Sequence, residues 1–145
     1  MDYRRFGDAY YVRLDRNDEI IGCIEKVCRD EGLRSATFTG IGGCSEAEIQ
    51  TFDPDRGEFE SEILSGMLEL INITGNVFSD PNGTMHHHAH AAFSFKKDGR
   101  SCMAGGHLKS VTVLYTAEIV LKPTIGGTIL SRFDTVTGTS FWDFE

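Results

Sequence analysis

The 145-residue chain lacks a long apolar run and a paired cysteine motif. No apolar stretch approaches the roughly 18 residues that a membrane-spanning helix needs, and the first residues lack the apolar core of a secretion signal. The four cysteines form no C-x-x-C pair, and a chain of this size needs no disulfide framework to bury a core. We therefore expect a cytoplasmic protein with reduced thiols, folded as a single domain over residues 1–145.

Basic residues are also scarce. Lys and Arg number 14 against 22 Asp and Glu, so the formal net charge is -8. A field of this sign repels the phosphate backbone of nucleic acids. The sequence also contains no R-G-R-P core of an AT-hook, the element that holds A·T-rich DNA. Composition therefore disfavours both DNA and membranes as partners.

Helical periodicity is clear in one segment, residues 17–31, where the apolar residues fall on one stripe. Asn17 is a candidate N-cap and Gly32 a candidate closing residue. Seven segments rich in β-branched and aromatic residues are predicted strands: 9–14, 35–41, 46–52, 59–64, 67–77, 87–95 and 111–121. The expected fold class is α+β, with one helix and about seven mainly antiparallel strands. The stretch "TGIGGCS" is expected to be a tight turn between two of them.

Histidine is concentrated in one place. Four of the five histidines lie in "HHHAH" at residues 86–90, and the fifth is His107. Side chains alternate along a strand, so His86, His88 and His90 share one face and His87 points to the other. Neighbours on the shared face are about 6.6 Å apart, which lets two adjacent imidazoles converge on one ion.

A predicted hairpin adds the fifth histidine. Asp98-Gly99 is typical of a type I′ turn, which needs positive φ at both central positions. Paired residue numbers then sum to 197, which sets His90 directly opposite His107 on the same face. His88, His90 and His107 are therefore the predicted ligands of one divalent metal. Zinc is the expected ion, because histidine is among its commonest ligands.

Two alternatives stay open at this point. A β-bulge at Gly105-Gly106 would shift the pairing by one residue, turn His107 away and make His86 an alternate ligand. The histidines could also form a solvated polar face with no metal, since isolated histidines are common on surfaces.

Five blocks of the sequence carry a family resemblance. They are "LELINITGNV" at residues 68–77, "HAH" at 88–90, "GGHL" at 105–108, "YTAEIVL" at 115–121 and "SRFDTVTG" at 131–138. Together they resemble the PPC domain, which is conserved in plants and prokaryotes and is also known as domain of unknown function 296. The resemblance implies a mainly antiparallel sheet, a homotrimer and, in prokaryotic members, a metal, often zinc, on the H-x-H and GGH histidines. Plant relatives carry an AT-hook, and this chain has none. It therefore resembles the prokaryotic stand-alone type, although the family label reads "PD1-like DNA-binding".

Glu69 and Glu118 are candidate catalytic residues. Each lies in an apolar strand, where an ionised carboxylate needs a partner. Either could be a fourth ligand, accept an imidazole N–H or act as a general base, and either could simply lie on a solvated sheet face. The aromatic tail, residues 141–144, also needs a cover, from the parent domain or from a neighbouring subunit.

The favoured hypothesis is a homotrimeric module that binds a divalent metal and acts through assembly or regulation. The alternative is a metal-dependent hydrolase or lyase that acts on a small molecule bound at the metal. Three neutral ligands leave an open coordination position, which is the pattern of catalytic zinc sites. A DNA-binding protein, as the family label suggests, is the third hypothesis, and the net charge of -8 argues against it.

Overall fold

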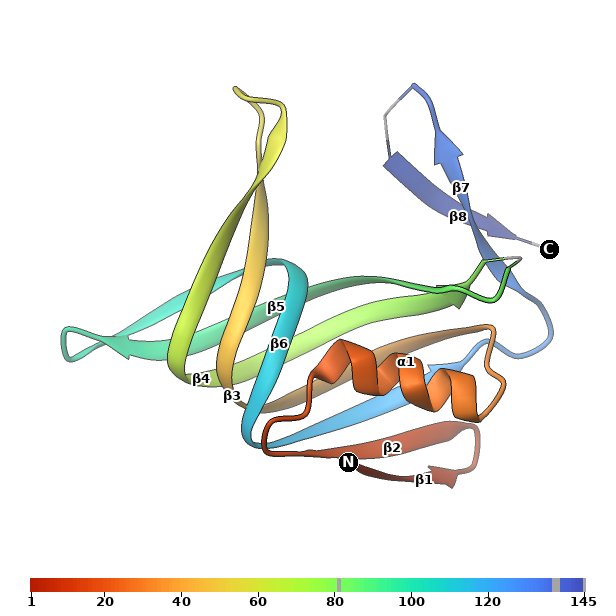
Figure 1. The fold of residues 1–145 in the computed structure, drawn as a ribbon, viewed down its shortest axis with the longest axis horizontal. Coiled ribbons are helices and arrows are strands. Elements are labelled where there is room, and N and C mark those ends of the chain that lie inside the picture. Colours follow the sequence, from red (N-terminus) through yellow and green to blue (C-terminus); the bar gives the residue numbers. More distant parts are fainter. Residues whose placement is uncertain (81, 137–138, 145) are drawn as a thin grey trace.

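A computed structural model describes residues 1–80, 82–136 and 139–144 of the chain. The elements in chain order are β1 (Asp2–Phe6), β2 (Ala9–Asp15), α1 (Ile20–Asp30), β3 (Ser35–Asp53), β4 (Glu58–Ser79), β5 (Met85–Lys97), β6 (Arg100–Pro123), β7 (Ile129–Asp134) and β8 (Thr139–Phe144). The first six strands form one antiparallel sheet in the order β1-β2-β6-β3-β4-β5, and β7 and β8 form a separate hairpin (Figure 1). The expected α+β fold class is confirmed.

Four strands of the large sheet pair in a closed cycle. Strand β3 pairs with β4, β4 with β5, β5 with β6, and β6 again with β3. The long β6 first pairs with β5 and then leaves it to follow β3. His107 lies where the two pairings meet, opposite His90 of β5 and Gln50 of β3.

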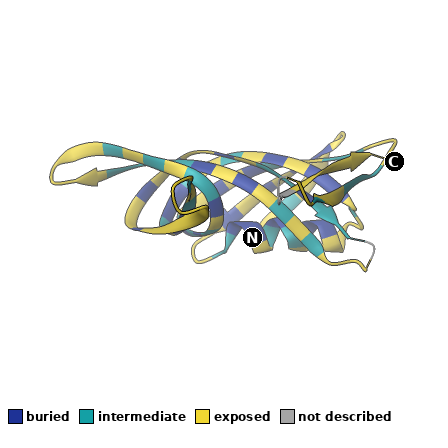
Figure 2. Ribbon diagram, turned by 90° about the horizontal axis from the view of Figure 1, so that it is seen from above, coloured by how far each residue is buried: buried dark blue, intermediate teal, exposed yellow. Residues whose placement is uncertain are grey.

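The sheet has two unlike faces. The inner face packs under α1 and buries apolar side chains such as Val12, Phe38, Phe93 and Leu121. The apolar stripe of α1 is buried against it and consists of Ile20, Ile21, Ile24, Val27 and Cys28. Along the strands, buried and exposed residues alternate, so the outer face carries the polar and exposed partners of the core residues (Figure 2).

The helix is shorter than the periodic segment. It begins at Ile20, and its N-cap is Glu19, whose carboxylate accepts the backbone N–H groups of Ile21 and Gly22. The prediction of Asn17 as N-cap is wrong, because Asn17 has a φ of 70° and donates its N–H to β6. Gly32 does close the helix with a φ of 66°, as expected.

Two observed strands each span a pair of predicted strands and the turn expected between them. Further strands that were not predicted lie near both ends of the chain. Strand β3 runs through "TGIGGCS" without turning, because bulges at Gly40/Gly42 and Cys44/Glu46 bend it instead. Strand β4 likewise joins two predicted strands, and β1, β7 and β8 lie outside the predicted ones. Thr137 and Gly138, the end of the "SRFDTVTG" block, lie outside the described residues.

No described helix is long and apolar enough to cross a membrane. All four cysteines are free thiols, as expected. Burial raises the pKa values of Cys28 and Cys44 to about 12, so neither thiol is a ready nucleophile at neutral pH.

Candidate metal centre

The β5–β6 hairpin has the predicted register. Asp98 and Gly99 have φ values of 51° and 76°, as a type I′ turn requires. Lys97 lies opposite Arg100, and the pairing continues without interruption to His90 opposite His107. The two strands therefore present these two imidazoles on the same face, and the prediction of their pairing is confirmed.

Gly105 and Gly106 allow two strands to approach β6 next to His107. A Cβ on Gly105 would lie 2.5 Å from the carbonyl oxygen of Ala91 in β5. A Cβ on Gly106 would lie 2.6 Å from the carbonyl oxygen of Gln50 in β3. The glycines thus make room for close backbone approach and do not form a bulge against β5, so the one-residue slip does not occur.

Three histidines from β5 and β6 come together on the outer face. The ring centroids of His88 and His107 are 4.6 Å apart, those of His90 and His107 4.8 Å, and those of His88 and His90 5.3 Å. One ring nitrogen of each lies within 4.8 Å of one from each of the others, the only such group of His, Cys, Asp and Glu among the described residues. Ligand nitrogens around tetrahedral zinc are about 3.3 Å apart, so small side-chain rotations would close the set on an ion.

Electrostatics favour the neutral, ligating form of His88 and His107. Partial burial, together with the neighbouring His90 and His87, lowers the pKa of His88 below its usual value. Burial and the adjacent imidazoles lower the pKa of His107 in the same way. At neutral pH both rings thus keep a lone pair for a cation, because protonated imidazoles cannot ligate.

The other two histidines have partners of their own. His87 lies on the inner face, with Nδ1 3.1 Å from a carboxylate oxygen of Glu25 in α1. His86 shares the outer face but stacks on Phe78 and places Nε2 3.3 Å from Asp80. Neither belongs to the group of three.

Asn76 carries an unpaired acceptor beside the triad. It lies directly opposite His88 across the β4–β5 ladder, on the same outer face. Its Oδ1 is buried and has no hydrogen-bond partner among the described residues. An imidazole that ligates a metal carries N–H on its other nitrogen and usually donates it to a nearby acceptor. The triad and this acceptor therefore fit the donor set of a histidine metal site.

Neither Asn76 nor Phe59 was among the site residues expected from the sequence. Phe59 lies near the start of β4, and its ring centroid is 5.3 Å from that of His107. The "GN" within the "LELINITGNV" block was the available signal for Asn76. No local pattern marks Phe59, because its contact depends on the closed cycle of strands.

Glu69 and Glu118 lie elsewhere on the outer face. Both line a hollow together with Ile41 and Tyr115, apart from the three histidines. Glu118 is opposite Arg13 of β2, and Glu69 is opposite Ser94 of β5. Neither carboxylate joins the group of potential ligands, and their catalytic role stays a prediction.

The chain matches a known protein family over most of its length. The sequence model of the Plants and Prokaryotes Conserved (PCC) domain matches residues 1–125, so the chain belongs to this family, the PPC domain of the sequence resemblance. A search of curated proteins gives no match.

Solved structures of similar proteins agree with this assignment. A plant- and prokaryote-conserved protein from Pyrococcus horikoshii is 29% identical, with a TM-score of 0.80 over 98% of this chain and 93% of that one. A proposed DNA-binding protein from Ralstonia eutropha JMP134 is 28% identical, with a TM-score of 0.85 over 99% and 96% of the two chains. A metal-containing protein from Archaeoglobus fulgidus is 28% identical, with a TM-score of 0.79 over 98% of both chains.

Proposed function

We propose that this PCC-domain chain is a homotrimeric module that holds one divalent metal ion on His88, His90 and His107 and acts through assembly or regulation. The convergence of three ring nitrogens within 4.8 Å is the observation that carries the metal site. Similarity to the metal-containing protein from Archaeoglobus fulgidus supports it. Zinc is the proposed ion, because it accepts imidazole ligands in tetrahedral geometry.

Asn76 contributes to this site as a positioning residue. Its buried Oδ1 would accept the N–H of the imidazole nitrogen that does not ligate the metal. The neighbour across the ladder is His88, so this ring is the proposed donor. Such a hydrogen bond would hold one tautomer of His88 and its lone pair toward the ion.

A metal-dependent hydrolase or lyase is the second candidate function. An ion on three neutral imidazoles keeps its full charge and a free coordination position for a small molecule. The observation that favours this function is a hollow lined by both His88 and His107. The polar side chains around it, which would orient a substrate there, are those of the histidines, Asn76, Asp80, Ser131 and Ser140.

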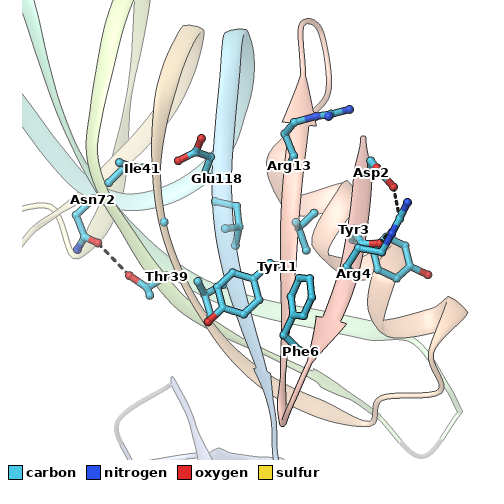
Figure 3. A pocket seen from close by; sticks show the side chains of 14 residues that line it. Asp2, Tyr3, Arg4, Phe6, Tyr11, Arg13, Thr39, Ile41, Asn72 and Glu118 are labelled. Atoms are coloured by element: carbon cyan, nitrogen blue, oxygen red, sulfur yellow. Dashed lines mark hydrogen bonds and ion pairs between the residues drawn. The ribbon is translucent and has the colours of Figure 1, made fainter.

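The proposed trimer needs a surface between subunits, and the outer face offers one. Large apolar side chains are exposed there, including Phe6, Tyr11, Ile41, Met67, Ile71 and Tyr115. Figure 3 shows Phe6 and Tyr11 side by side on this face, with Glu118 between the strands that carry Tyr11 and Ile41. Clusters of exposed apolar side chains are typical of a surface that another protein covers.

The metal proposal is tested with untagged protein dialysed against zinc and measured by elemental analysis. We expect one zinc per chain, and an anomalous-scattering map should place the ion between the three imidazoles. A loaded protein whose ion lies on His86 and His87 alone would contradict the proposal.

The trimer is tested by light scattering on a sizing column. We expect about three times the chain mass of 16.1 kDa, and a mass that stays at 16.1 kDa at all concentrations would overturn it. Ile41→Glu should shift the mass toward the monomer, because it places a charge on the exposed apolar face. Duplex DNA is not a proposed partner, and a submicromolar, salt-sensitive gel shift with random duplex would contradict this.

A further inference from the structure

A hollow of about 630 Å³ lies between the histidine face and the C-terminal hairpin. One wall comes from β4, from Asp80 after it, from the start of β5 with His86, His87 and His88, and from His107 of β6. The other wall comes from β7 and β8. In Figure 1 the hairpin stands above the right-hand ends of β4 and β5, near the start of the histidine run. Small-molecule pockets in proteins have about 300–1,000 Å³, so the hollow has the size of a ligand site.

The hairpin wall is aromatic. Phe133, Phe141 and Trp142 line the hollow and keep 63%, 46% and 46% of their surface exposed. Across the hollow, Phe78 and His86 stack with their ring centroids 5.5 Å apart and their planes 17° from parallel. Rings on both walls favour a flat apolar body, because aromatic groups gain energy from stacked or edge-to-face contact.

The other end of the hollow is polar. His88 and His107, two of the three proposed ligands, line it, so a molecule in the hollow would lie next to an ion held on the triad. Asp80 also lines it, but its carboxylate already accepts the backbone N–H groups of Asn82 and Thr84 and lies beside His86. The polar end thus suits a group that brings an oxygen to a cation.

The residues around the hollow also argue against phosphate esters. Its described lining contains no Lys or Arg, the side chains that usually bind phosphate groups. The ligand charge would therefore be met by the ion alone, which suits a single anionic oxygen donor better than a phosphate or a nucleotide.

We propose that this hollow binds a small planar aromatic molecule that carries a carboxylate-like or hydroxamate-like oxygen donor, with the ring against Trp142 and the oxygen at the triad. This inference rests on the proposed metal site and deepens it, because it names the class of ligand. Trp142 thereby becomes a specificity-determining residue on a hairpin that does not belong to the main sheet.

The test compares two hydroxamates on zinc-loaded protein by isothermal titration calorimetry. Benzohydroxamate and acetohydroxamate offer the metal the same chelating group, and only the first has a ring. We expect benzohydroxamate to bind at least about tenfold more tightly, because the ring is removed from water against the hairpin. Equal affinities for the two probes in a protein with full zinc content would overturn the inference.

Variants locate the ring. Trp142→Ala should weaken benzohydroxamate binding about tenfold and change acetohydroxamate binding less than about twofold. Val136→Ala is the matched control, since Val136 lies on the same hairpin and is 90% exposed but does not line the hollow. Elemental analysis of the wild type and of each variant separates the outcomes. Wild-type protein that holds no zinc refutes the proposed metal site, whereas zinc-loaded protein without ring preference refutes only the ligand class.

The position of the ring can also be tested in the wild-type protein, without relying on a variant that must fold. Trp142 is the only tryptophan, so its fluorescence reports on the hairpin wall alone. Benzohydroxamate should reduce acrylamide quenching of Trp142, and acetohydroxamate should leave it unchanged. Quenching that neither probe alters at saturation would contradict a ring seated on Trp142.

Discussion

His87 and His88 are neighbours in sequence, yet they belong to opposite faces of the same sheet. His87 points under α1 and contacts Glu25, whereas His88 points outward to His107. The inner face is a continuous apolar core, and the outer face combines an imidazole cluster with exposed aromatic side chains. One strand thus supports the core with one face and the candidate metal site with the other, because successive side chains along β5 point to opposite faces of the sheet.

The largest difference between the faces should appear in stability. Phe93 is fully buried on the inner face of β5, so Phe93→Ala should lower the free energy of unfolding by about 3–5 kcal/mol. His90→Ala, on the outer face of the same strand, should change the value for metal-free protein by less than about 0.5 kcal/mol. Urea unfolding at one chain concentration measures both, and a similar loss for the two variants would remove the distinction between the faces.

Zinc affinity should depend on the outer face and not on the inner one. His88→Ala and His107→Ala should each reduce zinc affinity at least about a hundredfold, because two imidazoles cannot hold the ion in a tetrahedral site. His87→Ala should keep wild-type affinity, since His87 lies under α1. Competition with a chromogenic chelator gives the affinities. Zinc loss in His87→Ala alone would place the ion on the inner face and contradict the prediction.

A smaller effect is expected from the unpaired acceptor. Asn76→Ala should weaken zinc binding by about 10–100-fold, as removal of an outer hydrogen-bond partner typically does. Asn72→Ala is its control on the same face of β4, because Asn72 accepts from Thr39 and is not part of the triad. If both variants bind zinc like the wild type, Asn76 has no positioning role.

The smallest effect concerns pH and the metal-free protein. The pKa values of His88 and His107 are lowered in the folded state relative to 6.5, so the unfolded chain binds more protons below that pH. Their contribution to stability is therefore present above about pH 6.5 and is lost as the pH falls through the lowered values. Urea midpoints between pH 7.5 and 5.5 should decline less in a His88→Ala/His107→Ala double variant than in the wild type.

Local chemistry explains which elements were predictable. The helix stripe and its closing Gly32 are visible in the sequence, because helical periodicity and a positive φ depend on nearby residues. The Asp98-Gly99 turn sets the hairpin register, and this register in turn brings His90 and His107 together. These features involve contacts within one helix or one hairpin.

Other features depend on distant contacts and were missed or misjudged. Glu19 rather than Asn17 caps the helix, and its carboxylate also accepts the N–H of Val111 in β6. The glycine-rich "TGIGGCS" bends within β3 because β4 and β6 pair with both of its sides. A turn and a bulged central strand use the same residues, so the sequence pattern alone does not separate them.

The α+β class and the three-histidine face can be read from the amino-acid sequence alone, since strand alternation and a two-residue turn relate residues that are close along the chain. The family follows from the resemblance of the sequence blocks and from the match of the family model. The three-dimensional structure adds that Asn76 lies beside the triad with no hydrogen-bond partner for its Oδ1 among the described residues. It also shows that Glu69 and Glu118 lie away from the triad and that the aromatic hairpin faces it across a hollow. The physical reason is that these relations are set by the closing of β3–β6 and by the placement of the C-terminal hairpin, where contacts join residues far apart in sequence.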